Sequence, residues 1–112
     1  MFLGKVIGNV WATKKWEQVR GLKFLAIRPY TLKELAGRKK QQGPYTDLVI
    51  AADLLGACIG EDVIVAYGHA ARAALEELDP GGLPRHPIDA AVIAIVDRYH
   101  VDKEVVDRYD DR

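Results

Sequence analysis

Few residues of this 112-residue chain have the type and spacing that catalysis would need. The sequence contains no serine, which excludes every mechanism that uses a serine nucleophile. Cys58 is the one thiol, but no histidine is close to it in the sequence, and its neighbours are small and apolar. We therefore interpret Cys58 as a buried structural residue rather than as a nucleophile.

The remaining ionisable residues do not form a recognisable metal or acid–base site. The three histidines are scattered, with no i, i+4 pair and no Cys/His cluster. Glu61 and Asp62 are adjacent in a predicted strand, so their side chains point to opposite faces and make a poor acid–base pair. The glycine loop at residues 56–60 lacks the lysine of a phosphate-binding loop. The sequence predicts no catalytic residue, metal or cofactor, and hence not an enzyme.

Composition and charge indicate one soluble domain. The 16 basic residues balance 16 acidic ones, which gives no support for the broad basic surface of a nucleic-acid-binding protein. A single cysteine excludes an internal disulfide and fits a reducing compartment. The N-terminus lacks the pattern of a signal peptide, and no apolar run approaches the roughly 20 residues of a membrane span. We expect a cytoplasmic protein without a membrane partner.

Five apolar stretches bounded by turn residues predict strands, at residues 1–13, 22–29, 44–53, 61–68 and 89–97. The alanine-rich residues 69–78 predict a short helix between the fourth and fifth strands. Thr31 and Glu34 have capping-box spacing, so residues 31–43 contain one helical turn or form a long hairpin loop. The tail at residues 98–112 is a weak helix or a frayed end, since Val101, Val105 and Tyr109 are spaced at i, i+4, i+8.

These elements predict a mainly all-β fold. Strands that are apolar on both faces usually belong to parallel sheets, but the crossovers of such a sheet need more helices than this chain offers. We therefore predict a small antiparallel barrel of five strands whose outer face is covered in part by other subunits. Gly4 and Gly8 permit the bending that a closed barrel requires, or they mark bulges in an open sheet.

The loop at residues 54–60, between the third and fourth predicted strands, is unusually apolar. It carries Leu54, Leu55 and Ile59, and it contains no lysine or arginine. A loop of this composition either folds back over the core or packs against another copy of the chain. We expect Gly56 to be needed there for its backbone torsions or for a close approach.

Four motifs in register resemble the EutN/CcmL family, the vertex proteins of bacterial microcompartment shells. Residues 4–13 (GKVIGNVWAT) look like the family's G-x-V-x-G-x-V-x-A-T start, and residues 21–25 (GLKFL) look like its second strand. Residues 53–63 (DLLGACIGEDV) are similar to its D-x-x-G-A-G-x-G-E-x-V centre, and residues 87–97 (PIDAAVIAIVD) to its P-V-D-A-A-I-V-G-I-V-D end. The resemblance covers residues 1–97.

The resemblance implies an OB-like barrel over residues 1–97, followed by a tail at residues 98–112. It implies a homopentamer that closes the fivefold vertices of a polyhedral shell in the cytoplasm, with hexameric shell proteins as partners and no catalysis. The residues that it suggests for an axis or pore loop, or for a subunit contact, are Gly56, Ala57, Cys58, Ile59, Gly60 and Arg72.

The chain departs from the family pattern in three places. Cys58 replaces the middle glycine of the loop, which makes a metal or cluster on the symmetry axis conceivable, although a small core residue is the simpler interpretation. Residues 68–72 read GHAAR where the family has G-S-S-A-R, so His69 replaces a hydroxyl cap at the helix start. The basic loop at residues 33–42 is longer than the family pattern.

An OB-fold module that binds single-stranded nucleic acid is the alternative function. Such a module stacks bases on exposed aromatic residues in a basic groove. The chain has a basic cluster at residues 38–40, which is otherwise a solvated loop tip, and aromatic residues that include Trp11, Trp16, Tyr30 and Tyr45. Neutral net charge and aliphatic strands argue against this groove. A small enzyme that uses Cys58 is a third alternative, but it lacks a base.

Overall fold

A computed structural model describes residues 1–13, 15, 21–36, 48–75 and 88–110, and the backbone alone of three positions in the last helix. The strands are β1 (Phe2–Val10), β2 (Lys23–Pro29), β3 (Val49–Asp53), β4 (Asp62–Tyr67) and β5 (Ala90–Val96). The helices are α1 (Leu32–Leu35), α2 (Gly68–Ala74) and α3 (Lys103–Asp110). The five predicted strands are therefore confirmed. Each lies within its predicted range and is shorter than that range, and the start of the predicted third strand, residues 44–47, lies outside the described residues.

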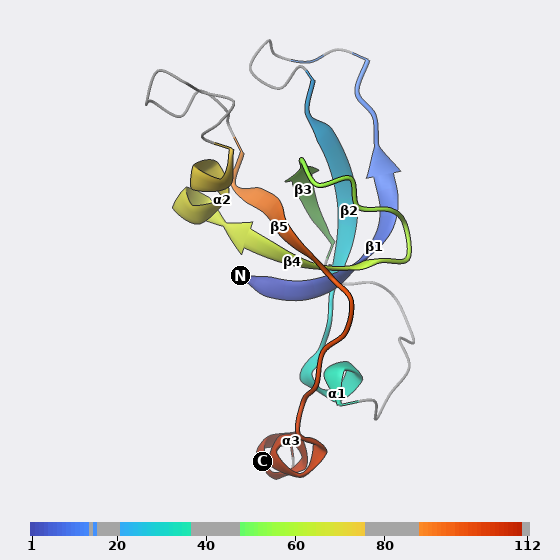
Figure 1. The fold of residues 1–112 in the computed structure, drawn as a ribbon, viewed down its shortest axis with the longest axis vertical. Helices are drawn as coiled ribbons and strands as arrows, with labels where there is room; N and C mark the ends of the chain where they lie inside the picture. Colours follow the sequence, from blue (N-terminus) through green and yellow to red (C-terminus); the bar gives the residue numbers. More distant parts are fainter. Residues whose placement is uncertain (14, 16–20, 37–47, 76–87, 111–112) are drawn as a thin grey trace.

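The five strands close into a barrel in the order β1-β2-β3-β5-β4 (Figure 1). Four of the strand pairings are antiparallel, whereas β3 pairs with β5 in parallel through Ala52–Ala91 and Asp53–Val92. The prediction of an antiparallel barrel was wrong at this pair, because β5 lies between β3 and β4 and runs antiparallel to β4 but parallel to β3. A five-stranded Greek-key barrel of this kind is the OB-fold architecture.

The barrel interior is filled by aliphatic side chains from all five strands. The most buried core residues are Val6, Leu25, Ile27, Ala51, Ala57, Val63, Val65, Ala90 and Val92. Alternate positions of β2 and β4 contribute to this core, as expected for strands with one face turned inward. A second, smaller cluster joins Ala52, Leu75 and Ile88, which seats the end of α2 on the outside of the barrel wall.

The two glycines of β1 have different functions. A Cβ atom at Gly4 would lie 2.8 Å from both the Arg28 carbonyl oxygen and Ile27 Cγ2, so only glycine fits where β1 crosses β2. Gly8 follows a bulge, because the pairing with β2 shifts register between Val6 and Gly8. The bulge occurs in a closed barrel, so both features predicted for these glycines are present.

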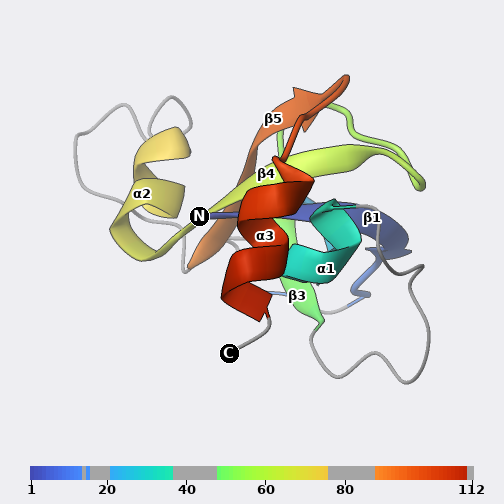
Figure 2. The ribbon, with the colours of Figure 1, turned by 90° about the horizontal axis from the view of Figure 1, so that it is seen from below.

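Helices α1 and α3 lie side by side below one end of the barrel (Figures 1 and 2). Helix α1 begins at the predicted capping box, in which Thr31 Oγ1 accepts a hydrogen bond from the Glu34 N–H and the Glu34 carboxylate accepts one from the Thr31 N–H. The tail forms α3 rather than a frayed end, and Val106 is buried against the rest of the molecule. The stripe predicted through Val105 was wrong, since Val105 is exposed and the buried position of the helix is Val106.

Helix α2 was predicted correctly, between β4 and β5, although it begins at Gly68 rather than at His69. Its N-cap is Tyr67, whose side chain makes no capping hydrogen bond. Gly68 has φ +59°, and its N–H donates to the Asp89 carbonyl oxygen at 2.7 Å. The expectation that His69 caps the helix was therefore wrong, because His69 lies inside the helix, one residue after Gly68.

Candidate functional site

Residues 54–60, which we call the outer loop, are held by a buried carboxylate at the end of β3. Asp53 is 3% exposed, and its two oxygens accept hydrogen bonds from the Leu55 N–H at 2.9 Å and the Ala57 N–H at 2.8 Å. An aspartate that accepts from the backbone two residues further on forms an Asx turn. Asp53 therefore fixes the path of the chain as it leaves the barrel.

Lys23 ties the same turn to β2. Its Nζ lies 3.7 Å from Asp53 Oδ2 and donates a hydrogen bond to the Ala57 carbonyl oxygen at 2.9 Å. Ala57 thus has both its N–H and its carbonyl group bonded to side chains, and its methyl group is fully buried in the barrel core. The Lys23 side chain is about half exposed, so the buried carboxylate has a charged partner that remains in contact with water.

The far end of the outer loop is fixed by Glu61 and by two glycines. Glu61 Oε1 accepts from the Cys58 N–H at 2.8 Å, and the Gly60 N–H donates to the Val6 carbonyl oxygen of β1 at 2.8 Å. Gly56 and Gly60 have φ of +81° and +93°, a region that side-chain-bearing residues rarely adopt. The predicted need for glycine torsions at Gly56 is confirmed, whereas no atom lies within 4 Å of a Cβ placed there, so close approach is not the reason.

The outer loop turns its large side chains to solvent. Leu54, Leu55 and Ile59 are 46%, 50% and 59% exposed. Of the two alternatives for this loop, folding back over the core is at most partial in the single chain, since about half of each of these side chains stays in solvent. These three side chains form an apolar surface that water covers when the chain is alone.

Cys58 is exposed, so its interpretation as a buried structural residue was wrong. The core position next to it belongs to Ala57, because the Ala57 N–H donates to Asp53 and the Ala57 carbonyl oxygen accepts from Lys23, which together hold the Ala57 backbone inward. The Cys58 thiol donates a long hydrogen bond to the Gly56 carbonyl oxygen at 3.8 Å. Among the described residues, no cluster of three or more His, Cys, Asp or Glu side chains could hold a metal ion.

An apolar hollow of about 300 Å³ lies where the outer loop meets α2 and β5. Its lining consists of Ala52, Leu54, Leu55, Ala74, Leu75, Val92 and Ile93. Arg72 is exposed on the last turn of α2, and it does not line this hollow. The structure therefore brings five of the six predicted contact residues together in the outer loop and leaves Arg72 on the neighbouring helix.

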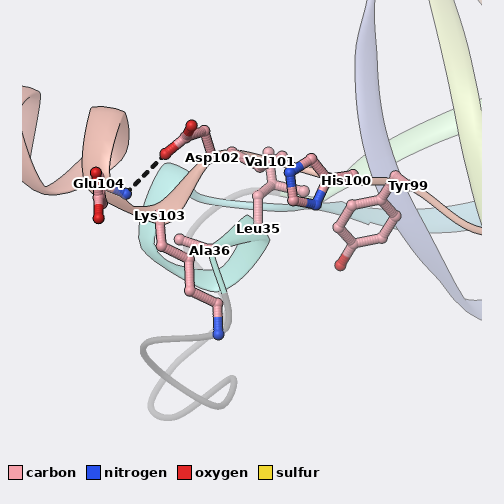
Figure 3. A pocket seen from close by; sticks show the side chains of 8 residues that line it. All are labelled: Leu35, Ala36, Tyr99, His100, Val101, Asp102, Lys103 and Glu104. Carbon is pink, nitrogen blue, oxygen red and sulfur yellow. Dashed lines mark hydrogen bonds between the residues drawn. The ribbon is translucent and has the colours of Figure 1, made fainter.

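A second, more open depression lies between α1 and the chain that leads into α3. Leu35 and Ala36 of α1 face residues 99–104, as Figure 3 shows, and the volume is about 590 Å³. Asp102 does not project freely into it, because Asp102 Oδ1 accepts the N–H groups of Glu104 and Val105 at the start of α3. The lining mixes apolar, basic and acidic groups without a convergent set of donors or acceptors for one ligand.

Polar side chains connect the barrel to α1. The Tyr30 hydroxyl donates to Asp62 Oδ1 at 2.5 Å, and Arg28 pairs with Glu34 at 3.0 Å with both side chains largely buried. Burial raises the pKa of Tyr30 well above its ordinary value, and the hydrogen bond to Asp62 and its negative charge act in the same direction. This network is structural, since it contains no group that is free to bind a substrate anion or a metal.

Among the described residues, the aromatic side chains considered for nucleic-acid stacking do not form a shared stacking surface. Trp11 is 85% exposed beyond the end of β1. Tyr30 is half-buried, and its hydroxyl is hydrogen-bonded to Asp62. Trp16, Tyr45 and the basic cluster at residues 38–40 lie outside the described residues. No helix of the described part is long and apolar enough to cross a membrane.

Sequence reasoning missed Asp53, Lys23 and Glu61 as the residues that shape the outer loop. The signal was present in part, because an aspartate that ends an apolar stretch and precedes a glycine-bearing loop is typical of an Asx turn. Lys23 could not have been found in this way. It is 34 residues from Ala57 in the sequence, and only the pairing of β2 with β3 brings them together.

Comparisons with known proteins agree with one another. The family model described as "Ethanolamine utilisation protein EutN/carboxysome" matches residues 1–97. The microcompartment shell vertex protein GrpN of Rhodospirillum rubrum is 38% identical over 97 residues, which cover 87% of this chain and 93% of the relative. The carboxysome shell vertex protein CcmL of Synechococcus elongatus is 34% identical over 112 residues, or 100% of this chain and 97% of the relative.

A solved structure supports the same relationship. The pentameric microcompartment shell protein GrpN of Rhodospirillum rubrum superposes with a TM-score of 0.66 at 35% sequence identity. The match covers 91% of this chain and 99% of the GrpN chain. The solved structure that this chain resembles is therefore that of a pentameric protein.

Proposed function

The chain belongs to the EutN/CcmL family, and we propose that it is a structural protein that forms pentamers at the vertices of a bacterial microcompartment shell. The sequence resemblance to this family is confirmed by the family match and by the relatives. The pentameric assembly of GrpN and the shell location of the named relatives support the proposal. The shell, and with it the protein, lies in the cytoplasm.

The observation that carries the proposal is the outer loop. A free chain exposes Leu54, Leu55 and Ile59 on a backbone in which three N–H groups are already bonded to carboxylates. Exposed apolar side chains on an ordered backbone are suited to burial against a neighbouring subunit, because association then loses little conformational entropy. We infer that residues 56–60 contact the next subunit in the ring and that Arg72 lies at the border of this contact.

A fivefold ring needs two different contact faces on each chain. In a head-to-tail ring each subunit presents one surface to the subunit before it and another to the subunit after it. The outer loop supplies the first face. We infer that the second face uses exposed apolar side chains outside the outer loop, such as Val10, Trp11, Leu48 and Ile50.

The proposed partners of the pentamer are hexameric shell proteins. A sheet of hexamers closes into a polyhedron only where fivefold units replace sixfold ones, which gives a pentamer a structural task without catalysis. We propose no enzymatic activity, because the relatives are shell proteins and the exposed Cys58 has no base bonded to it in the described contacts. We do not propose the nucleic-acid alternative, since the names of the relatives given above describe shell proteins and none mentions nucleic acid.

The mass of the native particle tests the assembly. Native mass spectrometry of the purified chain should give five chains of 12.4 kDa each, or about 62 kDa. A monomer at micromolar concentration would contradict the proposal. Co-expression with a hexameric shell protein tests the vertex role: closed polyhedral particles are expected with this chain, and open sheets or tubes without it.

A further inference from the structure

Asp53 is the one charged or polar residue that is buried in the described part of the chain. Its side chain has no exposed surface, and it lies at the point where the barrel core ends and the outer loop begins. Transfer of a carboxylate from water into a protein interior is costly unless hydrogen bonds and a counter-charge compensate it. A barrel wall of aliphatic residues has no packing reason to contain this group, so its partners indicate what it does.

All the partners of Asp53 act on the outer loop. Its oxygens accept the N–H groups of Leu55 and Ala57, one each, and Lys23 bridges from Asp53 Oδ2 to the Ala57 carbonyl oxygen. Glu61 adds a third carboxylate contact to the Cys58 N–H. Three N–H groups of the outer loop, those of Leu55, Ala57 and Cys58, are therefore bonded to carboxylates.

This backbone arrangement determines where the apolar side chains point. With the N–H groups of Leu55 and Ala57 directed inward, the side chains of Leu54, Leu55 and Ile59 are left outside. Apolar side chains in water gain free energy when more of their surface is buried. Leu54 and Leu55 already line the hollow beside α2 and β5, and about half of each side chain remains exposed. The carboxylate bonds hold the loop in this position and oppose further collapse in the free chain.

We propose that Asp53 is the positioning residue of the subunit contact: it orders the outer loop before assembly and presents Leu54, Leu55 and Ile59 to the neighbouring copy. Glu61 does the same for the Cys58 end of the loop. This inference rests on the proposed pentamer, because the neighbouring copy is the surface that covers these side chains. It assigns to Asp53 a role in assembly that is separate from the stability of the barrel.

Asp53→Asn is the main test variant, and Asp102→Asn is its matched control. In Asp53→Asn the amide nitrogen replaces one acceptor oxygen and faces an N–H group of the loop, so one donor loses its partner. Asp102 also accepts two backbone N–H groups, but through one oxygen, at an exposed site outside the outer loop. Hydrogen exchange of the loop amides and native mass spectrometry over a concentration series are measured for both variants.

We expect Asp53→Asn to raise the exchange rates of the Leu55 and Ala57 amides by about tenfold or more, and the concentration at which the ring dissociates by a similar factor. Exchange of the β1, β2 and β4 amides in the dissociated chain should be unchanged. Asp102→Asn should change neither quantity. Equal acceleration of loop and barrel amides would overturn the proposal, because Asp53 would then be a general stability residue.

Glu61→Ala keeps the proposal testable if Asp53→Asn does not fold. Glu61 is half-buried and Cys58 is exposed, so this substitution removes a loop contact without leaving a buried group unpaired. We expect faster exchange of the Cys58 amide and weaker assembly, with an intact barrel. An unchanged ring would overturn the positioning role. A wild-type chain that stays monomeric would refute the pentamer instead, while the loop exchange rates would still test Asp53.

Discussion

The outer loop and the C-terminal extension (residues 98–110, with α3) both leave apolar side chains in solvent, but they are held in opposite ways. In the outer loop the backbone is bonded to three side chains, Asp53, Lys23 and Glu61, and two glycines adopt positive φ. In the extension, α3 lies beside the four-residue helix α1, Val106 is buried, and Val105 remains 43% exposed. The first region is ordered by the barrel itself, and the second by its contacts with α1 and with Tyr30 at the end of the barrel.

This difference indicates which of the two surfaces is suited to a permanent contact between subunits. A loop whose backbone bonds are already formed loses little entropy on association, whereas an eight-residue helix is not stable in water without its packing partner. The family match also ends at residue 97, before the extension begins. We infer that the ring contact depends on the outer loop and that the extension can be weakened without loss of the ring.

Gly56→Val should have the largest effect, because it attacks the loop backbone directly. A β-branched residue at φ +81° is strained by about 1–3 kcal/mol, and the strain can be relieved only if the loop leaves its present path. Gly8→Ala is the control, since its new Cβ would lie 3.6 Å from Ala26 Cβ, an ordinary contact. We expect urea denaturation to show a loss of stability and native mass spectrometry a loss of the ring for Gly56→Val alone. A Gly56→Val ring of wild-type stability would refute the role of the loop.

The need for glycine at position 56 could be predicted from the sequence, because a glycine that follows an Asp-bearing strand end is a local signal. The five strands and α2 could also be predicted, since apolar stretches and breaker residues mark them. The exposure of Cys58 could not. Whether Ala57 or Cys58 points inward depends on the bonds to Asp53 and Lys23, and Lys23 arrives from a distant strand.

The same limit applies to the other errors. The parallel pairing of β3 with β5 depends on how the barrel closes, which no local pattern encodes. The helical spacing of the tail indicated a helix but selected Val105 for its buried face. The buried residue is Val106, and α3 lies beside α1, an arrangement that joins segments separated by most of the chain.

Val106→Ala should have an intermediate effect that is confined to the extension. It deletes two buried carbon atoms, which costs about 1–2 kcal/mol of local packing at ~0.8 kcal/mol per methylene. We expect faster hydrogen exchange throughout α3, with the mass of the ring unchanged. Val105→Ala is the matched control, because the same atoms are removed from an exposed position and α3 should keep its protection. Loss of the ring in Val106→Ala would show that the extension takes part in the subunit contact and would remove the distinction between the two regions.

Tyr30→Phe should have the smallest effect, and it tests the joint between the barrel and the extension. Tyr30 donates to Asp62 of β4, and its ring lies 6.3 Å from that of Tyr99 at the start of the extension. Loss of the hydroxyl should cost about 1 kcal/mol in urea denaturation at pH 7.

Because burial raises the pKa of Tyr30, the folded chain keeps this proton at a pH where the unfolded chain loses it, at about 10 and above. The stabilisation is therefore complete below about pH 10 and declines as the pH rises further, so the difference between wild type and Tyr30→Phe should shrink in that range. Tyr99→Phe, which removes the hydroxyl of the neighbouring ring, is the control and should show no such change. A stability difference between wild type and Tyr30→Phe that stays constant from neutral to strongly alkaline pH would mean that the Asp62 bond does not stabilise the joint.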